Sequence, residues 1–346
     1  MSRIPPEFAV HIPEDRVALY PAVSRENARL IVYSRLKREI VHIGSFSDII
    51  PFLASDVIVL NDTKVLPVRL IGKRAGGGLV ELLFITVDDA PIKRVLINPS
   101  RRLHSGAELS LPGDASLVLL SKVTGEGWLC EWRQGKEGQG FSEYLLEYGL
   151  PPLPPYIKRA VEPTDRERYQ TVYAVYPGSL AAPTAGFHFT PDLMAQLSSN
   201  GSEFVPVTLT VGLGTFQPIR DDDITKHQMH IEQYHIPQQT ATAIATAKEV
   251  GRAVTAIGTT SVRALEASAA MFGRVQAGAG EAGIFIYPPY EFKVIDKLVT
   301  NFHRPDSTLM QLMAALIGWE ALNLVYQTAL DNDFRFFSYG DSMLVL

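Results

Sequence analysis

The feature that most constrains this chain is a set of four polar-rich segments, each placed where an apolar, strand-like run stops. They are SLAAPTAGFHF (Ser179–Phe189), VGLGTFQPI (Val211–Ile219), AIGTTSVRALE (Ala256–Glu266) and VTNFHRPDST (Val299–Thr308). A chain that repeatedly ends strands in Gly, Thr, Asn or His places polar groups at one end of a sheet. In α/β folds, ligands bind at that end. The sequence therefore predicts a site built where several strands end.

The order of the predicted elements indicates two kinds of domain. After residue 151, strand-like and helix-like runs alternate, which predicts parallel strands joined by crossover helices. Between residues 65 and 137, short β-rich runs are separated by turns such as Gly76-Gly77-Gly78, which is typical of a small antiparallel barrel or sandwich. We therefore expect an α/β fold: a barrel-like catalytic domain made of residues 1–64 and 151–346, interrupted by an antiparallel all-β, barrel-like insert at residues 65–150.

Local signals give the expected elements. One helix is predicted at the end of the insert, at Phe141–Gly149, followed by the stiff Pro-rich run Leu150–Tyr156. The run Gly278–Gly283 fits G-x-G-x-x-G, but a helix precedes it and a strand follows, the reverse of a dinucleotide-binding context, so we expect a loop there. In the catalytic domain we expect strands at Val57–Leu60, Val205–Val211, Ala253–Gly258, Gly283–Tyr287, Lys297–Asn301 and Phe334–Ser338, and helices at Leu193–Leu197, Thr240–Gly251, Val262–Phe272, Leu309–Leu316 and Glu320–Leu330.

Composition excludes several classes of protein. The chain has 346 residues, 46% of them hydrophobic, which is enough for two domains or one large barrel. Its single cysteine, Cys130, excludes internal disulfides and an iron–sulfur cluster held by the chain's own thiolates. No apolar run reaches the length of a membrane span, and the N-terminus lacks the apolar core of a signal peptide. We therefore expect a cytoplasmic enzyme.

The charge distribution leaves nucleic-acid binding open. The net charge is −5, whereas proteins that bind nucleic acid are usually basic. Between Lys64 and Pro112, however, eight Lys and Arg residues stand against four acids, a local balance of +4. An ordinary solvated face is the alternative interpretation, and charge alone favours it.

The segment AIGTTSVRALE is predicted to hold a strand, a turn and the start of a helix. Thr259, Thr260 and Ser261 are natural N-cap residues, and the first turn of a helix exposes N–H groups that attract a phosphate or a carboxylate. Arg263 is a cation near the positive end of the helix, which favours a role in holding an anion. A capped helix with nothing bound is the alternative.

Histidines in three places are candidates for acid–base or hydrogen-bonding roles. In HQMHIE, the spacing of His227 and His230 could suit a metal, but the flanking residues predict a loop and a strand, so we expect no metal. His188 lies among small residues that let backbone approach a ligand. His303 follows the strand end at Asn301. A structural, hydrogen-bonded histidine stays possible at each position.

Two further groups of residues each have a functional and a structural interpretation. Asn61, Asp62 and Lys64 form a polar strand end, although Asn-Asp-Thr is also a common turn sequence. Tyr169 lies beside Arg166 and Arg168, and such mixtures of aromatic and basic side chains suit nucleobases and phosphates. A helix packed by its Tyr face explains the same pattern.

Five other segments carry a resemblance to a known family: VLNDTKVLPVRL (Val59–Leu70), LPPYIKR (Leu153–Arg159), DRERYQTVYA (Asp165–Ala174), HQMHIE (His227–Glu232) and RFFSYGDSMLVL (Arg335–Leu346). With the four polar segments they run in order along nearly the whole chain. The chain resembles the S-adenosylmethionine:tRNA ribosyltransferase-isomerases of queuosine synthesis. The resemblance implies the same two-domain organisation.

The resemblance also implies an activity. Enzymes of this family transfer and isomerise the ribosyl part of S-adenosylmethionine onto 7-aminomethyl-7-deazaguanine at the wobble position of a tRNA. Epoxyqueuosine forms, and adenine and methionine leave. A base must take the acidic C–H proton beside the sulfonium, and an acid should protonate adenine. A non-catalytic RNA-binding module on a barrel scaffold is the alternative, but four polar strand ends favour an enzyme.

The candidate residues fall into three groups by expected role. The expected acid–base residues are His188, His227, His230, Glu232 and Asp62, with the division between acid and base left open. The expected contacts to the small substrate are Asn61, Lys64, Thr184, Gly212, Gly214, Thr215, Thr259, Thr260, Ser261, Arg263, Asn301 and His303. The expected contacts to tRNA are Arg69, Arg101, Arg102, Lys158, Arg159, Arg166, Arg168 and Tyr169.

Overall fold

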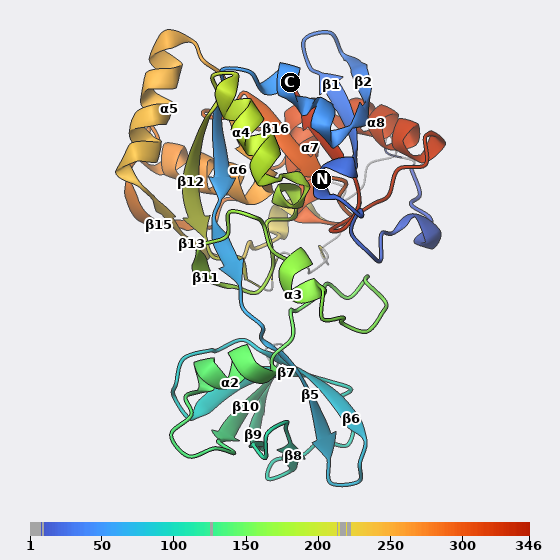
Figure 1. Ribbon diagram of the computed structural model, residues 1–346, viewed down its shortest axis with the longest axis vertical. Coiled ribbons are helices and arrows are strands. Elements are labelled where there is room, and N and C mark those ends of the chain that lie inside the picture. Colours follow the sequence, from blue (N-terminus) through green and yellow to red (C-terminus); the bar gives the residue numbers. More distant parts are fainter. Residues whose placement is uncertain (1–7, 9, 125–126, 213, 215–218, 220–222) are drawn as a thin grey trace. The chain divides into compact units, whose positions relative to one another are not determined.

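The protein forms two compact units (Figure 1). The computed structural model describes residues 8, 10–124, 127–212, 214, 219 and 223–346. One unit comprises Met1–Lys64, Pro154–Arg159 and Arg168–Leu346, and it is mixed α/β. The other comprises Val65–Leu153 and Ala160–Glu167, and it is built on an antiparallel barrel. The expected fold class is confirmed.

The α/β unit is built on a nine-stranded mixed sheet in the order β15-β13-β12-β3-β14-β16-β17-β1-β2. Its strands are β1 (Arg29–Ser34), β2 (Glu39–Ser45), β3 (Val57–Asn61), β12 (Glu203–Leu209), β13 (Glu232–Ile236), β14 (Val254–Ile257), β15 (Gly278–Ala282), β16 (Lys297–Asn301) and β17 (Ser342–Val345). The neighbouring strands β12, β3, β14 and β16 are parallel, so their carboxyl ends lie at one edge of the sheet. Because β17 is antiparallel to β16, its first residue, Ser342, lies opposite Asn301 at that same edge.

Helices and two apolar cores cover this sheet. The helices are α1 (Ile50–Leu53), α4 (Pro191–Ser199), α5 (Gln238–Val250), α6 (Gly258–Phe272), α7 (Thr308–Ile317) and α8 (Trp319–Asp331). In β3, Val57 and Val59 belong to the core that holds α6, whereas Ile58 and Leu60 belong to the core that holds α4. Side chains alternate across a strand, so the continuous apolar run VIVL is what a strand covered on both faces requires.

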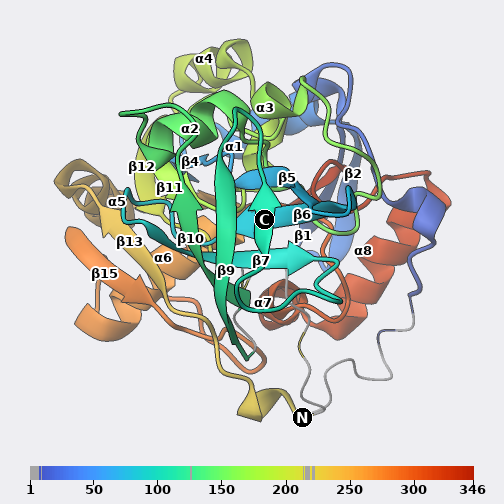
Figure 2. The ribbon, with the colours of Figure 1, turned by 90° about the horizontal axis from the view of Figure 1, so that it is seen from below.

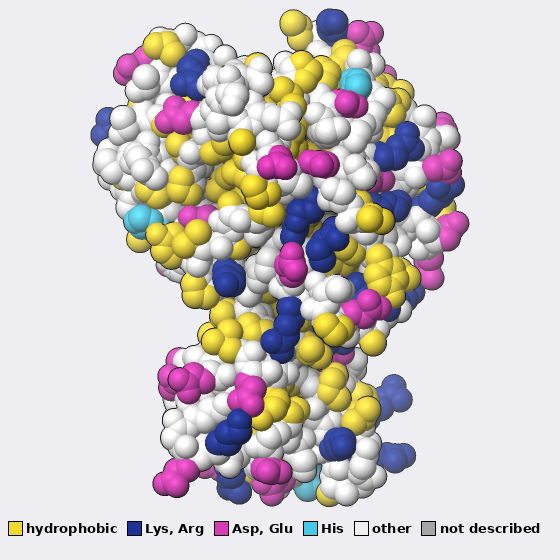
Figure 3. Space-filling model, viewed as in Figure 1, with side chains coloured by type: hydrophobic (Ala, Val, Ile, Leu, Met, Phe, Trp, Pro, Cys, Tyr) yellow, Lys and Arg dark blue, Asp and Glu magenta, His cyan; other side chains and the backbone are white. Residues whose placement is uncertain are grey.

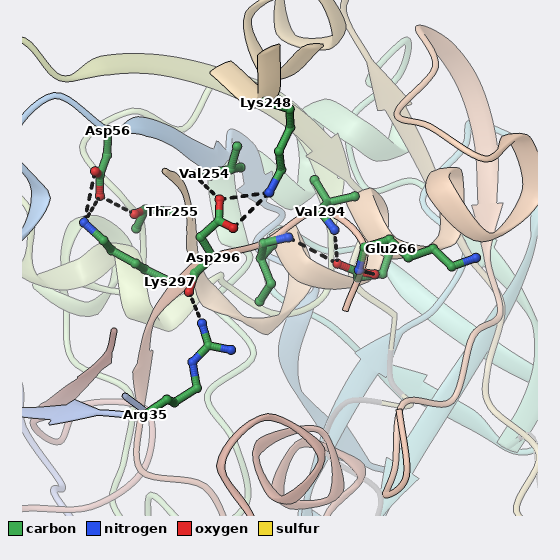
Figure 4. Close-up of polar contacts among 11 residues, drawn as sticks. Arg35, Asp56, Lys248, Val254, Thr255, Glu266, Val294, Asp296 and Lys297 are labelled. Atoms are coloured by element: carbon green, nitrogen blue, oxygen red, sulfur yellow. Dashed lines mark hydrogen bonds and ion pairs between the residues drawn. The ribbon is translucent and has the colours of Figure 1, made fainter. Parts of the chain in front are cut away.

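The amino ends of the parallel strands are held by buried carboxylates (Figure 4). Asp56, just before β3, accepts hydrogen bonds from Lys297 Nζ at 2.8 Å and from Thr255 Oγ1 at 2.7 Å. Glu266 of α6 is fully buried and accepts a hydrogen bond from the Val294 amide at 3.0 Å. Removing one partner of such a pair would leave a buried charge uncompensated. This edge therefore has a structural role, which leaves the opposite edge for ligands.

The second unit contains a closed six-stranded barrel in the order β10-β7-β6-β5-β8-β9 (Figure 2). Its elements are β5 (Arg69–Arg74), β6 (Leu79–Phe84), β7 (Ile92–Asn98), β8 (Glu108–Ser110), β9 (Ser116–Val123), β10 (Gly127–Arg133) and α2 (Phe141–Tyr148). Burial alternates along β5, β6 and β7, as the wall of a filled barrel requires. Phe141 of α2 packs against Phe84 and Trp132, with ring centroids 5.0 Å apart in both pairs.

The remaining short elements lie outside the barrel and the large sheet. They are β4 (Thr63–Val65), α3 (Asp165–Arg168) and β11 (Tyr176–Ser179).

Three predicted elements were wrong. The glycine-rich run is not a loop: Gly278–Ala282 is strand β15, where a Cβ on Gly280 would lie 2.4 Å from Tyr234 Oη, so this glycine serves close packing. Gly283–Tyr287 is not a strand, because the strand lies just before it. The final strand is β17, whereas Phe334 and Phe336 of the predicted strand pack their rings against Phe302. Aromatic core packing gave Phe334–Ser338 its strand-like pattern.

Among the described helices, no single one is long and apolar enough to cross a membrane. α7 and α8 reach that length and composition only when taken together, and a bend of 110° separates them.

Candidate functional site

Residues of all four polar segments line one open cleft of the α/β unit, and Val211 is the one described residue of the second segment among them. The cleft encloses about 790 Å³ of space between the protein atoms, a volume that includes its open, solvent-filled mouth. It lies at the carboxyl ends of the parallel strands. Its lining comprises Tyr156, Ala181, Ala182, Pro183, Thr184, Ala185, Val211, Gly258, Thr259, Thr260, Thr300, Asn301, Phe302, His303, Arg304, Asp306, Ser307, Leu309, Phe337 and Ser338.

The amino end of α6 faces this cleft. Gly258 has a φ of +81°, a conformation that glycine adopts at little cost, and it lets β14 pass directly into the helix. No side chain caps the helix: Ser261 was expected to, but its Oγ donates to the Ile257 carbonyl oxygen at 2.8 Å. Thr260 Oγ1 is buried and has no partner within the described residues. The first-turn amides and the helix dipole therefore favour an anionic group in the cleft.

A second helix also begins at the cleft. Ser307 caps α7 by accepting a hydrogen bond from the Met310 amide at 3.2 Å, and Ser307 itself lines the cleft. Two helix amino ends therefore add positive potential to one cavity.

His303 lines the cleft as a hydrogen-bonded, neutral group. Its Nε2 lies 2.8 Å from Thr300 Oγ1, and its backbone amide donates to Tyr326 Oη at 2.7 Å. Burial lowers the pKa of His303 to about 4. The imidazole is therefore uncharged near neutral pH, which suits a hydrogen bond to a substrate better than a charge–charge contact.

His188 lies just behind the wall of the cleft. Its side chain is buried, and Nε2 lies 3.2 Å from Oδ1 of Asn301, which does line the cleft. Burial lowers the pKa of His188 to about 4. His188 forms part of the wall of a smaller cavity of about 220 Å³, together with Arg25, Arg168 and Tyr339. His303 and His188 therefore differ, because His303 lines the cleft directly and His188 reaches it only through Asn301.

The HQMHIE segment contributes to a separate cavity of about 310 Å³. As predicted, its histidines precede a strand, β13, and do not lie on a helix. His227 packs edge-on against Phe285, with ring centroids 5.3 Å apart. His230 is exposed, and its ring fills the space that a Cβ on Gly214 would need, so residue 214 must be glycine for this packing.

Arg263 and Glu232 form a buried ion pair beside that cavity. Arg263 Nη1 donates to Glu232 Oε2, and Nη2 donates to the Ala282 carbonyl oxygen at 2.7 Å. The second carboxylate oxygen of Glu232 accepts the Gly212 amide at 3.0 Å. In this structure the guanidinium of Arg263 donates to protein groups and lines the separate cavity, not the cleft, so the expected anion clamp stays a prediction. Both oxygens of Glu232 are likewise engaged, which makes it a poor acid–base group.

The polar end of β3 is structural. Asn61 Nδ2 donates to the Leu209 carbonyl oxygen at 3.1 Å, and Asn61 Oδ1 accepts the Leu209 amide at 3.0 Å, so this side chain ties β3 to β12. Asp62 accepts a hydrogen bond from Thr208 Oγ1 at 2.6 Å, and burial raises its pKa. Lys64 is exposed. None of the three lines the cleft, whereas Thr184 does. Thr215 lies outside the described residues.

The expected tRNA contacts divide into exposed and engaged side chains. Tyr169 is fully buried, with its ring against Phe187 and Tyr339, so this structure offers no exposed surface of Tyr169 to tRNA. Most of the basic candidates are engaged with protein groups: Arg69 with Glu81, Lys158 with Glu14, Arg159 with the Leu19 carbonyl oxygen, Arg166 with the Gly149 carbonyl oxygen and Arg168 with the Ala22 carbonyl oxygen. Arg101 and Arg102 are exposed.

Sequence reasoning missed several residues of the cleft wall. Tyr156 lines the cleft, donates to or accepts from Ser338 Oγ at 2.6 Å, and has a pKa raised to about 12 by burial. Arg304 also lines the cleft and pairs with Asp306 at 2.8 Å. Both residues lie inside segments that carry the family resemblance, LPPYIKR and VTNFHRPDST. These two motifs could therefore have indicated Tyr156 and Arg304 as site residues. Among the residues that the structure describes, no group of three or more His, Cys, Asp or Glu could hold a metal ion.

Comparison with known proteins gives one consistent result. A family model described as "Queuosine biosynthesis protein" matches residues 6–345. The chain is 45% identical over 342 residues to an S-adenosylmethionine:tRNA ribosyltransferase-isomerase of Citrifermentans bemidjiense, covering 98% of each chain. It is 43% identical over 341 residues to the protein of the same name from Geobacter sulfurreducens, again covering 98% of each. The crystal structure of S-adenosylmethionine tRNA ribosyltransferase from Thermotoga maritima is similar, at 31% identity and a TM-score of 0.56, covering 98% of this chain and 100% of that one.

Proposed function

The chain belongs to the family of queuosine biosynthesis proteins, and from that premise we infer its activity. It is an S-adenosylmethionine:tRNA ribosyltransferase-isomerase. It transfers and isomerises the ribosyl part of S-adenosylmethionine onto 7-aminomethyl-7-deazaguanine in the wobble position of a tRNA. The products are epoxyqueuosine-tRNA, adenine and methionine. The single observation that supports this site for the reaction is the cleft formed by all four polar segments at the carboxyl ends of the parallel strands.

We place the methionine end of S-adenosylmethionine at the amino end of α6. A carboxylate there would accept hydrogen bonds from the first-turn amides of Thr259 and Thr260, and the helix dipole would stabilise its charge. The neutral His303 and the hydroxyl group of Thr184 would then face the sugar. These groups can donate or accept hydrogen bonds as the ribose oxygens rearrange.

The reaction begins with removal of a proton from the ribose carbon beside the sulfonium. The base gains that proton, and the electron pair stays on the carbon, where the neighbouring positive sulfur stabilises it. His188 is the candidate base that we favour, because it is neutral and lies against the cleft wall through Asn301. His227 and His230, in the separate cavity, are the remaining candidates for the acid that protonates adenine.

The test of the activity is release of adenine from S-adenosylmethionine. Purified protein should release adenine when the tRNA carries 7-aminomethyl-7-deazaguanine, and chromatography of the products should find one adenine for each tRNA modified. A tRNA with unmodified guanine at the wobble position is the matched control and should release none. Binding of tRNA without any release of adenine would favour a non-catalytic RNA-binding module.

No metal is needed for this chemistry as we propose it. Dialysis against a strong chelator should therefore leave the rate of adenine release unchanged. A loss of rate that zinc restores would contradict the proposal. That result would make His227 and His230 the first residues to test as ligands.

The barrel unit is proposed to hold tRNA. Its Lys and Arg side chains are interspersed with acids on the face shown in Figure 3, and the segment from Lys64 to Pro112 has the local balance of +4. Replacing the exposed Arg101 and Arg102 by Glu should weaken tRNA binding and flatten its salt dependence, since each lost phosphate contact lowers the slope by about one. Replacing the exposed acids Glu137 and Glu143 by Gln is the control. Unchanged tRNA affinity at low salt in the arginine variant would make those arginines ordinary surface residues.

A further inference from the structure

The hydrogen bonds of Asn301 decide which ring nitrogen of His188 carries a proton. Asn301 Nδ2 lies 3.0 Å from the Phe337 carbonyl oxygen and 3.3 Å from the Ser338 carbonyl oxygen. Carbonyl oxygens only accept hydrogen bonds, so the NH2 group of the amide must face them. The opposite orientation would place three oxygens together. The network therefore fixes Oδ1 of Asn301 toward His188.

The orientation of the amide then fixes the tautomer of the imidazole. Asn301 Oδ1 can only accept, so His188 Nε2, 3.2 Å away, must carry a hydrogen. Burial lowers the pKa of His188 to about 4, so near neutral pH the ring holds one proton only. With that proton on Nε2, the second nitrogen, Nδ1, keeps its lone pair.

The surroundings of Nδ1 leave its lone pair available to accept a proton. Within the described part of the chain, the only hydrogen bond of the His188 side chain is the one from Nε2. His188 forms part of the wall of the smaller cavity, together with Arg25, Arg168 and Tyr339. The two nitrogens of an imidazole ring point in different directions, so Nδ1 can accept a proton while Nε2 stays on Asn301.

We propose that Asn301 is a positioning residue that holds His188 as the Nε2–H tautomer, so that Nδ1 is the ring nitrogen that accepts the proton from the substrate. This deepens the proposed function and rests on it, because a proton acceptor needs a reaction to serve. The tautomer, in contrast, is a property of the resting protein and can be measured without any substrate.

The charged groups around His188 support the neutral ring. Arg25 lies in the 3-10 helix Arg25–Asn27, Arg335 follows α8, and Asp341 precedes β17. Burial is the largest influence and lowers the pKa of His188; the two guanidinium groups lower it further, whereas the Asp341 carboxylate and the hydrogen bond to Asn301 raise it. On the remaining side the ring packs against Phe46, with centroids 5.0 Å apart.

The tautomer can be measured by NMR on the full-length protein labelled with ¹⁵N-histidine. The chain has eight histidines, and His188→Gln identifies the signals of His188. Long-range ¹H–¹⁵N correlation should show His188 with a protonated Nε2 and an unprotonated Nδ1 throughout pH 6–9. A protonated Nδ1, or signals averaged between two tautomers, would overturn the proposal. This arm uses the wild-type protein, so it does not depend on a variant that folds.

The catalytic part is tested by the pH dependence of kcat in Asn301→Asp. A carboxylate facing Nε2–H stabilises the imidazolium and so raises the pKa of His188. Its second oxygen faces the Phe337 and Ser338 carbonyl oxygens, so a thermal melt accompanies the kinetics, and the NMR experiment on wild-type protein decides the tautomer if the variant does not fold. A base that must be neutral loses activity as the pH falls through its pKa. In the variant, the acidic limb of the pH profile of kcat should therefore move to higher pH, by the same amount as the shift in the pKa of His188 that NMR measures. The exposed Asn200→Asp is the control and should leave the limb in place. A shifted pKa with an unshifted limb would overturn the role of Nδ1. Absence of adenine release by wild-type protein would instead contradict the proposed function.

Discussion

Replacing His188 by Gln is expected to lower kcat for adenine release by about 10²–10⁴-fold, the usual contribution of a general base, while the melting temperature stays close to that of the wild type. The amide NH2 of Gln takes the place of Nε2–H and can still donate to Asn301 Oδ1. It offers no basic nitrogen at the position of Nδ1. Steady-state kinetics and a thermal melt on the same preparation give both quantities.

His188→Asn is the matched control for the two ring nitrogens. Asn places an oxygen near the position of Nδ1 but no donor near Nε2, so the buried Oδ1 of Asn301 loses its partner. An unsatisfied buried acceptor costs about 1–3 kcal/mol, so this variant should melt earlier than His188→Gln. If His188→Gln folds normally and keeps full kcat, His188 has a structural role only.

Replacing Arg263 by Ala is expected to lower the free energy of unfolding by about 3–5 kcal/mol, because it leaves the Glu232 carboxylate buried without its cation. Both side chains are less than a tenth exposed, so water cannot take the place of the guanidinium. Activity should fall as well, because Glu232 also holds the Gly212 amide at the end of one polar segment. Denaturant unfolding and kcat measure the two effects.

A double-mutant cycle separates the ion pair from an anion clamp. Glu232→Gln combined with Arg263→Met removes both charges and should recover most of the lost stability. Arg263→Lys should recover only part, because Lys lacks the forked guanidinium. Lys158→Ala, which breaks an exposed pair with Glu14, is the control and should melt like the wild type. If Arg263→Ala unfolds like the wild type and only raises the KM for S-adenosylmethionine, Arg263 is an anion clamp after all.

The sequence predicted the framework because strand ends carry a local signal. The apolar run before Asn301 and the polar run after it mark the edge of the sheet whatever the strand order. The prediction of secondary structure failed where one sequence pattern fits two different structures. Aromatic residues at Phe334 and Phe336 suit a strand and an aromatic core equally, and the rings of Phe302 and Tyr326 decide for the core. The glycines of Gly278–Ala282 suit a loop and a tightly packed strand equally, and the ring of Tyr234 decides for the strand.

The candidate site shows the same limit at the level of single side chains. The sequence indicated which polar residues lie near the strand ends, but it did not indicate which groups their side chains hydrogen-bond to or pair with. Arg263 was expected to bind an anion near a helix amino end, and it does bind one: the anion is Glu232, from a strand 31 residues earlier in the chain. Asn61 was expected to contact substrate, but its amide joins two strands. Such pairs depend on strand order, which composition and periodicity do not encode.

A crystal structure of the protein with S-adenosylmethionine tests the central claim most directly, namely that the reaction takes place in the cleft at the carboxyl ends of the parallel strands. We expect the ligand in this cleft, with its carboxylate about 2.7–3.2 Å from the amide nitrogens of Thr259 or Thr260 at the start of α6. A carboxylate bound instead to Arg263, or a ligand whose ribose and carboxylate both lie outside this cleft, would contradict the account.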